Sequence, residues 1–241
     1  MKLGILYGGN ANEREVSLLT GESIYRAIHK DHETDLILLD GPVLSFIDTL
    51  KNYDLIFIAL HGGEGENGEI QQILDDHQIR YTGSGAKASR IAMDKSATKK
   101  ISNLKGIPTP EWIEISPDTS NINLPFPYPV VVKPNDEGST FGLTIVESAD
   151  NLETAIQKAS EYSSKILIEK FIIGRELTVG ILNDLPLPIV EIFPSHALFD
   201  YECKYTSGLS KYQCPAELDD GLTSKIQSSA LDIYKTIGCG H

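Results

Sequence analysis

The sequence contains few cysteines and no long apolar run. Its three cysteines, Cys203, Cys214 and Cys239, form no CxxC pair, which argues against a zinc ribbon or a disulfide framework and favours free thiols in a reducing compartment. No run approaches the roughly 20 apolar residues that cross a bilayer. The opening MKLGILYGGNANERE lacks the basic flank and apolar stretch of a secretory signal. We therefore expect a cytoplasmic protein without a membrane partner.

Positive charge is also scarce. The chain has 21 lysines and arginines against 34 aspartates and glutamates, a formal net charge of -13 and a pI near 4.8. This balance argues against nucleic acid as a partner, because binding a phosphate backbone requires a continuous basic face. With 241 residues and 41% apolar content, the chain can still bury a core. Any anionic ligand would have to be met by lysines gathered at one place.

The first 85 residues alternate short aliphatic runs with helix-like segments. LGILY, DLILLD and DLIFIAL predict strands, and a helix is expected from about Ser17. This alternation is typical of βαβ units and predicts a mostly parallel sheet. Ligand-binding loops of such sheets lie at the carboxyl ends of the strands, where Gly8-Gly9 and His61-Gly62-Gly63 are found.

A second block begins near Gly85, where the segment YTGSGAKAS interrupts the alternation. A charged helix over MDKSATKKISNLKG leads to IPTPEW, whose prolines exclude helix. The runs PVVVKP, LTIV and KILIEK predict strands and the residues from Asp150 to Tyr162 a helix, together a small antiparallel α+β unit.

From Gly174 onward, RELTVGIL and LPLPIVEIF predict paired strands joined at Asn183-Asp184. A polar loop and a helix from Leu218 to Ile237 follow. We thus predict an α/β chain divided into three domains. The predicted domains are residues 1–85, 86–173 and 174–241.

The most informative segment is VVVKPNDEGSTFG, in which a strand carrying Lys133 runs into a loop of small residues. Such residues let backbone N–H groups approach anionic oxygens, and the lysine supplies a matching cation. The segment matches neither the Walker A motif nor the GxGxxG fingerprint. Taken alone, it is also compatible with an ordinary hairpin loop.

Two other segments indicate a nucleotide site only when their order along the chain is considered. LIEKFIIGRE combines a strand with charged residues, and could offer backbone groups to an adenine and a carboxylate to ribose hydroxyls. Lys95 in MDKSATK would by itself be taken for a solvated helix residue.

Together these segments resemble the ATP-grasp superfamily, and the blocks around them resemble, in order, the D-alanine-D-alanine ligase family. The flanking blocks are GGNANEREVS, IALHGGEGENGEIQ, YTGSGAKAS and FDYECKY...YQCPA, so the resemblance covers essentially the whole chain. It implies an N-terminal Rossmann-like (pre-ATP-grasp) parallel-sheet domain followed by ATP-grasp α+β domains, the last incomplete. It also implies ATP-dependent joining of two D-alanines through a D-alanyl phosphate, for peptidoglycan precursor synthesis.

The resemblance assigns ATP-binding roles to individual positions. Lys95 and Lys133 would contact the phosphates, the EGSTFG loop would close over them, and Glu176 would bind the ribose. Lys204 would reach the transferring phosphoryl group and the second substrate. The implied ATP-binding residues are Lys95, Lys133, Glu137, Gly138, Ser139, Thr140, Glu169, Lys170, Ile172, Glu176 and Lys204, among which Glu169, Lys170 and Ile172 would hold the adenine.

The substrate roles follow from the same resemblance. Glu13 would meet the ammonium of the first D-alanine, and His61 would line that pocket. Ser139 and Tyr205 would form a hydrogen-bonded trio with Glu13, linking the phosphate loop to the mobile loop that carries DYECKY. Closure of both loops would exclude water from the acyl phosphate. The implied catalytic residues are therefore Glu13, Ser139, Tyr205 and Lys204.

The sequence also departs from the family pattern. Members continue beyond the GC motif with an arginine and with an aspartate, a glutamate and an asparagine that hold two Mg²⁺ ions. Those positions would lie beyond His241, so no metal ligand is assigned, and we expect weak nucleotide binding and no turnover. D-alanine-D-serine or D-alanine-D-lactate ligase and a non-catalytic nucleotide-binding fragment remain open, although Tyr205 disfavours D-lactate. The resemblance further implies a homodimer through the first domain.

Overall fold

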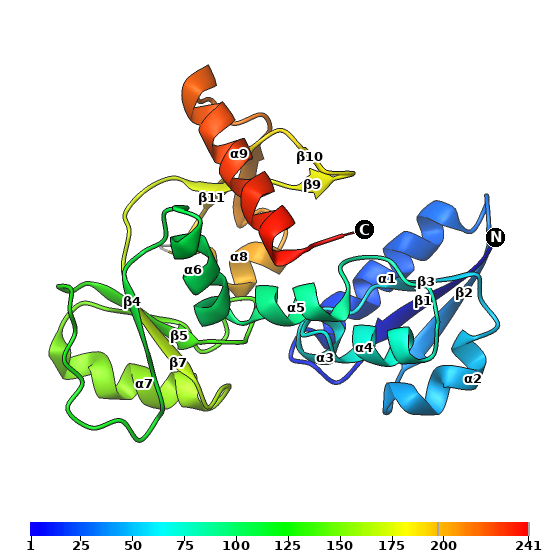
Figure 1. Cartoon of the computed structure of the whole chain (residues 1–241), viewed down its shortest axis with the longest axis horizontal. Helices are drawn as coiled ribbons and strands as arrows, with labels where there is room; N and C mark the ends of the chain where they lie inside the picture. Colours follow the sequence, from blue (N-terminus) through cyan, green and yellow to red (C-terminus); the bar gives the residue numbers. More distant parts are fainter. Residues whose placement is uncertain (197, 241) are drawn as a thin grey trace. The chain divides into compact units, whose positions relative to one another are not determined.

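The computed structural model describes residues 1–196 and 198–240 and divides the chain into two compact units. Unit 1 contains residues 1–93 with 238–240, and unit 2 runs from Asp94 to Ile237. In Figure 1, unit 1 is coloured blue to teal except for its terminal residues, and unit 2 runs from green to red. Among the described residues, no helix has both the length and the apolar character that membrane crossing requires.

Unit 1 is built on a parallel sheet with the strand order β2-β1-β3, which confirms the predicted parallel sheet. Its strands are β1 (Lys2–Gly8), β2 (Glu33–Leu39) and β3 (Leu55–Ile58). The central strand aligns Leu6 with Ile37 on one side and with Ile58 on the other. Beyond β3, Tyr81 forms a parallel bridge with Ile56 and extends the sheet.

Helices connect these strands and cover the sheet. They are α1 (Arg14–Ile28), the 3-10 turn η1 (Val43–Phe46), α2 (Ile47–Leu50), α3 (Gly63–Glu66), α4 (Glu69–Asp76) and α5 (Ala86–Met93). Helix α1 begins at Arg14, slightly before the predicted start at Ser17. Its Gly21 lies against Tyr7, because a Cβ there would come within 2.5 Å of the Tyr7 Cβ.

Helix α5 belongs to unit 1 because it packs closely on α4. Gly68, with a φ of +89°, precedes α4, and a Cβ at this position would lie 2.3 Å from the Ala86 carbonyl oxygen. Only a glycine permits both this backbone conformation and this approach. The structure therefore divides the chain between Met93 and Asp94, whereas the sequence placed a boundary near Gly85.

The buried aliphatic side chains of unit 1 form one core between sheet and helices. Burying such a side chain contributes roughly 1.5–3 kcal/mol relative to leaving it exposed. The core is formed by Leu6, Ile37, Leu39, Val43, Ile47, Leu50, Ile56, Leu60, Ile70, Leu74 and Ile79. It holds the loops after β1 and β3 at the carboxyl end of the sheet.

Unit 2 contains a four-stranded antiparallel sheet with the order β4-β7-β5-β6, as predicted for the central block. The strands are β4 (Trp112–Ile115), β5 (Val130–Pro134), β6 (Thr144–Val146) and β7 (Ile166–Lys170). The 3-10 turn η2 (Ala149–Asn151) leads into α7 (Leu152–Ser160), which lies along one face of this sheet (Figure 1). The aliphatic residues of β5 and β7 that face α7 are buried, so polar residues of the other face remain available for a site.

The rest of unit 2 contains a second sheet, a short hairpin and three helices. The sheet has the order β12-β11-β8, with β8 (Glu176–Thr178), β11 (Val190–Pro194) and β12 (Ser210–Gln213). The hairpin pairs β9 (Ile181–Leu182) with β10 (Leu185–Pro186). The helices are α6 (Lys95–Leu104), α8 (Tyr201–Tyr205) and α9 (Asp220–Ile237).

The predicted turn at Asn183-Asp184 is confirmed, since both residues have positive φ angles, 51° and 59°. Each of the two strands predicted around this turn is divided in two. The division arises because β8 pairs with β11, whereas β9 pairs with β10. Each predicted strand therefore contributes one part to the second sheet and one part to the hairpin.

Candidate functional site

Lys95 lies at the start of α6 and reaches the loop that follows β5. Asp94 caps this helix, with its carboxylate accepting the Ala97 N–H at 2.8 Å. The Lys95 ammonium donates to the backbone carbonyl oxygens of Glu137 at 2.5 Å and Asn135 at 3.3 Å. The side chain thus runs along the first residues of the predicted phosphate loop.

Lys133 and Glu169 lie on neighbouring strands and form an ion pair. Glu169 is aligned with Val131, so Lys133 occupies the diagonal position on the same face of the sheet. Its ammonium contacts Glu169 Oε1, and the Lys99 ammonium lies 2.9 Å from Oε2. Burial would raise the pKa of Glu169, but the charges of Lys133 and Lys99 outweigh it and hold this pKa below its usual value.

The ammonium groups of Lys95 and Lys133 act on one another. Burial first, and then the positive charge of Lys133, lower the pKa of Lys95 to about 8, although Asp136, Glu137 and Glu169 partly oppose the shift. Repulsion of this kind requires that the two groups lie close together. An anion that contacts both would relieve the repulsion, which is the behaviour expected of a polyphosphate site.

The loop over residues 135–142 has an unusual backbone. Ser139 and Thr140 have φ angles of 43° and 68°, in a region that residues with a side chain rarely adopt. Gly142 has a φ of 67°, and a Cβ there would lie 2.8 Å from both Pro134 Cγ and Tyr162 Cδ2. The loop joins the antiparallel strands β5 and β6, as a hairpin loop would, but its strained residues mark it as a candidate ligand-binding segment.

This loop is joined to α8 and the residues before it. The hydroxyl groups of Ser139 and Tyr205 lie 3.0 Å apart, and the Thr140 hydroxyl donates to the Phe199 carbonyl oxygen at 3.0 Å. The Phe141 ring lies 5.4 Å from the Tyr201 ring, measured between centroids. Within unit 2, the structure therefore places Ser139 and Tyr205, two members of the predicted trio, in contact.

Lys204 and the cap of α8 complete this region. The Lys204 ammonium lies 5.5 Å from the centroid of the Phe199 ring. Asp200 caps the helix by accepting the Cys203 N–H at 2.9 Å, and the same carboxylate pairs with His196 at 2.8 Å. These contacts fix the start of the helix that carries both Lys204 and Tyr205.

The residues predicted to hold adenine and ribose lie at the end of β7 and after it. The Lys170 N–H donates to the Glu111 carbonyl oxygen at 2.9 Å, Ile172 is 58% exposed and Glu176 begins β8. The antiparallel register aligns Val130 with Lys170 and Pro134 with Ile166. At about 3.3 Å per residue, the adenine segment and the phosphate loop are thus separated by roughly 13 Å, with Lys133 and Glu169 between them.

A second group of predicted residues lies within unit 1. Glu13 precedes α1, is only 4% exposed, and its carboxylate lies against the backbone of Gly62, where a Cβ would be 2.7 Å from Glu13 Oε2. The His61 ring contacts the Thr20 hydroxyl through Nε2 at 3.0 Å, and its backbone N–H donates to the Ser17 hydroxyl at 2.8 Å. Both residues lie at the carboxyl end of the parallel sheet.

Glu66 joins this group and was not selected by sequence analysis. Burial, and then the charge of Glu13, raise the pKa of Glu66, whereas His61, whose Nδ1 lies 3.9 Å from Glu66 Oε1, opposes the shift. The signal that could have identified it is its place in the glycine-rich segment directly after β3. Two mutually repelling carboxylates provide a suitable environment for a cationic ligand.

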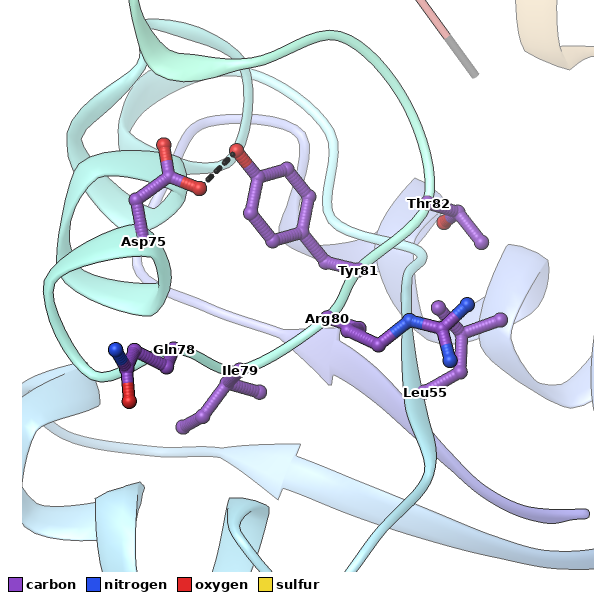
Figure 2. Close-up of a pocket in the computed structure, with 7 residues that line it drawn as sticks. All are labelled: Leu55, Asp75, Gln78, Ile79, Arg80, Tyr81 and Thr82. Atoms are coloured by element: carbon purple, nitrogen blue, oxygen red, sulfur yellow. Dashed lines mark hydrogen bonds between the residues drawn. The ribbon is translucent and has the colours of Figure 1, made fainter.

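Cavities of unit 1 lie at both ends of its sheet. A cavity of about 610 Å³ is lined by residues that include Leu55, Arg80 and Tyr81, and Figure 2 shows the Tyr81 hydroxyl directed at Asp75, 3.0 Å away. Leu55 begins β3, so this cavity lies at the amino end of the strand, where ligands of parallel sheets do not usually bind. A cavity of about 250 Å³ at the carboxyl end, lined in part by Leu60 and Glu66, is the better candidate for a ligand.

An antiparallel sheet that presents paired lysines beneath a small-residue loop, preceded in the chain by a parallel-sheet unit, defines a protein of the ATP-grasp class. The family model described as "D-ala D-ala ligase C-terminus" matches residues 101–241, which is more than half of the chain. The chain therefore belongs to the D-alanine-D-alanine ligase family.

Relatives agree with this assignment over the whole chain. A D-alanine-D-alanine ligase of Carboxydothermus hydrogenoformans is 42% identical, covering 99% of this chain and 80% of the relative. One of Hydrogenovibrio crunogenus is 39% identical over 100% of this chain and 77% of the relative.

Solved structures are similar as well. The D-alanine-D-alanine ligase from Bacillus anthracis matches with a TM-score of 0.87 and 34% identity over 100% of this chain and 80% of its own; a structure of that enzyme complexed with ATP matches with a TM-score of 0.86. VanG D-Ala:D-Ser ligase from Enterococcus faecalis matches with a TM-score of 0.78 and 27% identity, covering 99% of this chain and 83% of its own.

Proposed function

We propose that the chain is an ATP-dependent ligase that joins two D-alanines through a D-alanyl phosphate, for the synthesis of peptidoglycan precursors. The observation that carries the proposal is the position of two lysines at the loop over residues 135–142: the Lys95 ammonium donates to the Glu137 carbonyl oxygen, and Lys133 lies on β5, directly before the loop. The names of the relatives support the same reaction.

ATP extends along the pair of strands β5 and β7 in this proposal. The adenine lies at the end of β7, near Lys170 and Ile172, and the ribose hydroxyls meet the carboxylate of Glu176. The phosphates lie near Lys95 and Lys133 beneath the backbone of Gly138, Ser139 and Thr140. The roughly 13 Å between the two ends, estimated from the strand rise, supports this placement because it suits an extended nucleoside triphosphate.

The first D-alanine binds in unit 1, where its ammonium meets Glu13. His61 and Glu66 line the same pocket. The proximity of Glu13 and Glu66 supports the assignment, because a cation placed between two carboxylates relieves the repulsion between them.

The reaction proceeds in two steps. A carboxylate oxygen of the first D-alanine attacks the γ-phosphorus, the bond to the β-phosphate oxygen breaks and ADP leaves. The amine of the second D-alanine then attacks the acyl phosphate, the C–O bond breaks, and phosphate and a proton leave the dipeptide. Lys95, Lys133 and Lys204 stabilise the phosphoryl charge by position rather than by covalent chemistry.

Water has to be excluded while the acyl phosphate exists, because hydrolysis competes with the amine. We assign this role to the loop over residues 135–142 together with α8, with Ser139 and Tyr205 connecting them. Their hydrogen bond at 3.0 Å supports the assignment.

The family resemblance also implies two Mg²⁺ ions. Among the described residues, the one group of histidine, cysteine and acidic side chains close enough to hold a metal is His196, Asp200 and Cys203. Mg²⁺ requires oxygen ligands in octahedral geometry, so this nitrogen- and sulfur-containing group does not fit it. These three residues therefore do not account for the implied Mg²⁺ ions.

The reaction takes place in the cytoplasm, where ATP is available, with D-alanine and ATP as the small-molecule partners and without nucleic acid or membrane. A homodimer through unit 1 belongs to the same proposal. The acidic net charge supports the exclusion of nucleic acid.

A D-alanine-D-serine ligase is the second candidate, favoured by the similarity to VanG. D-serine differs from D-alanine by one hydroxyl group at the acceptor, and both present an amine. D-alanine, D-serine and D-lactate can be compared as competitors for binding to the complex of the chain with ATP. This comparison distinguishes the D-alanine-D-alanine and D-alanine-D-serine ligases, which both accept an amine, from a depsipeptide ligase, which accepts D-lactate.

The test of the proposal is a calorimetric titration of the whole chain with ATP, with and without D-alanine. A ligase that holds both substrates together should bind ATP more tightly when D-alanine is present. Lys133→Met should weaken ATP binding by about 10- to 100-fold, because a charge-assisted contact is lost. Lys100→Met, which removes an exposed lysine of α6, should have no effect. ATP binding that is unaffected by D-alanine would favour a non-catalytic nucleotide-binding fragment instead.

A further inference from the structure

Lys99 has no role in the site as described so far, yet it contacts the carboxylate at the centre of that site. Its ammonium lies 2.9 Å from Glu169 Oε2, while Lys133 contacts Oε1. Both Lys99 and Glu169 have side chains that are only 10% exposed. The three charges therefore form a buried cluster on the face of the sheet that carries Lys133.

The protein holds the Lys99 ammonium with several acceptors. It donates to the Thr109 hydroxyl at 2.7 Å and to the Pro110 carbonyl oxygen at 3.1 Å, in addition to its ion pair with Glu169. Burial lowers the pKa of Lys99, and Glu169 partly restores it. A buried ammonium with this set of acceptors is fixed in position and remains paired with Glu169.

The position of Lys99 follows from the periodicity of α6. Lys95 and Lys99 are four residues apart and occupy the same face of the helix, which is directed at the sheet. Lys100, the next residue, is exposed. The same helix face thus places Lys95 at the loop after β5 and Lys99 at Glu169.

Charge balance gives this arrangement its significance. Glu169 alone would neutralise Lys133, and a neutral pair attracts a polyphosphate weakly. With Lys99 also bound to Glu169, the cluster keeps one net positive charge. We propose that Lys99 is a positioning residue of the nucleotide site, which compensates Glu169 and so leaves the charge of Lys133 available to the phosphates.

The inference rests on the proposed nucleotide site, and inorganic tripolyphosphate tests it without any contribution from adenine contacts. Its affinity for the whole chain is measured by calorimetry at pH 7. Lys99→Met keeps an unbranched side chain of similar length but removes its charge, and should weaken binding about tenfold, the size of one partly screened charge interaction. Lys99→Arg keeps the charge and should bind within about threefold of the wild type. Lys100→Met is the matched control and should bind like the wild type.

The decisive variant combines Lys99→Met with Glu169→Gln. If Lys99 acts by compensating Glu169, removing the carboxylate should restore tripolyphosphate affinity to within about threefold of the wild type. A purely structural role of Lys99 predicts no such rescue. Equal affinities of Lys99→Met and the wild type, or a double variant that binds as weakly as Lys99→Met, would overturn the proposal.

Thermal unfolding and circular dichroism check that each variant folds. If Lys99→Met does not fold, the double variant and Lys99→Arg decide: wild-type affinity in both supports the proposal, and weak binding by the folded double variant overturns it. Lys133→Met separates this proposal from the proposed function. If Lys133→Met leaves tripolyphosphate affinity unchanged, the nucleotide site itself is wrong. If it weakens binding and Lys99→Met does not, only the role of Lys99 is wrong.

Discussion

The hydroxyl groups of Ser139 and Tyr205 lie 3.0 Å apart, which ties the loop after β5 to α8. The neighbouring Thr140 hydroxyl reaches the Phe199 carbonyl oxygen, and the Phe141 ring packs near Tyr201. Three successive loop residues thus contact the same short stretch of chain. The loop and the helix should consequently open and close together rather than independently.

Tyr205→Phe should loosen this connection, because it removes the hydroxyl and keeps the ring. Loss of one partly exposed hydrogen bond corresponds to about 0.5–1 kcal/mol, or roughly a two- to fivefold change in an opening equilibrium. Hydrogen exchange of the Phe141 and Leu143 amides, which donate to Gly138 and Thr140 carbonyl oxygens within the loop, should accelerate by that factor.

Tyr212→Phe is the control for this experiment. Tyr212 is exposed, and its ring lies edge-on to Phe199 at 6.5 Å between centroids. Its hydroxyl should not influence exchange in the loop over residues 135–142. Equal acceleration in both variants would show that the effect does not come from the Ser139 contact.

ATP affinity should fall as the pH rises through about 8, the pKa to which burial and Lys133 lower Lys95. The phosphates favour the charged ammonium, so ATP binding requires proton uptake wherever Lys95 is partly neutral. Calorimetric titrations between pH 6.5 and pH 9.5 measure this dependence. Lys95→Arg, whose guanidinium stays charged, should flatten the profile in this range; an unchanged profile in that variant would assign the titration to another group.

Gly142→Ala should destabilise unit 2 by about 1–3 kcal/mol, because alanine is strained at a φ of 67° and its Cβ would collide with Pro134 and Tyr162. Urea denaturation followed by tyrosine fluorescence measures the change. Gly174→Ala is the matched control, since a Cβ at Gly174 meets nothing within 4 Å and its φ is not positive. If Gly142→Ala lost no more stability than Gly174→Ala, backbone strain and collision at position 142 would be contradicted.

Glu66→Gln should stabilise unit 1 increasingly as the pH rises from 4 to 7. Burial and Glu13 raise the pKa of Glu66 in the folded state, so the folded state binds more protons than the unfolded state just above the usual pKa. Wild-type stability therefore falls with rising pH in this window. Glutamine is uncharged at every pH, so the variant lacks this pH-dependent loss of stability. Thermal unfolding at several pH values should show a difference that grows towards pH 7, whereas Glu161→Gln, which lies in unit 2, should show none of this trend.

The two main sheets could be predicted because their information is local. Aliphatic runs such as DLIFIAL and PVVVKP have the length and composition of buried strands, and the glycines and prolines between them mark the ends. The strands around Asn183-Asp184 were predicted as two and are four, because partner choice depends on residues far along the chain. The turn itself was predicted correctly from the two residues that form it.

In the candidate site too, contacts between residues far apart in the chain could not be predicted from the sequence. Lys95 and Lys133 were selected through motifs, and the structure places both at the loop over residues 135–142. Lys99 and Glu66 were not found, since a lysine in a charged helix and a glutamate in a glycine-rich loop both look solvated. Their significance arises only from Glu169 and Glu13, which reach them through tertiary packing.

The alignment of β5 with β7 limits how this region can change. Side chains alternate between the two faces of a strand, so Lys133 faces Glu169 only while Val131 stays aligned with it. Deleting a single residue from either strand would turn Lys133 towards the aliphatic side chains beneath α7, among them Ile156. In redesign or natural variation, these two strands can exchange one aliphatic residue for another, but they tolerate no change in length.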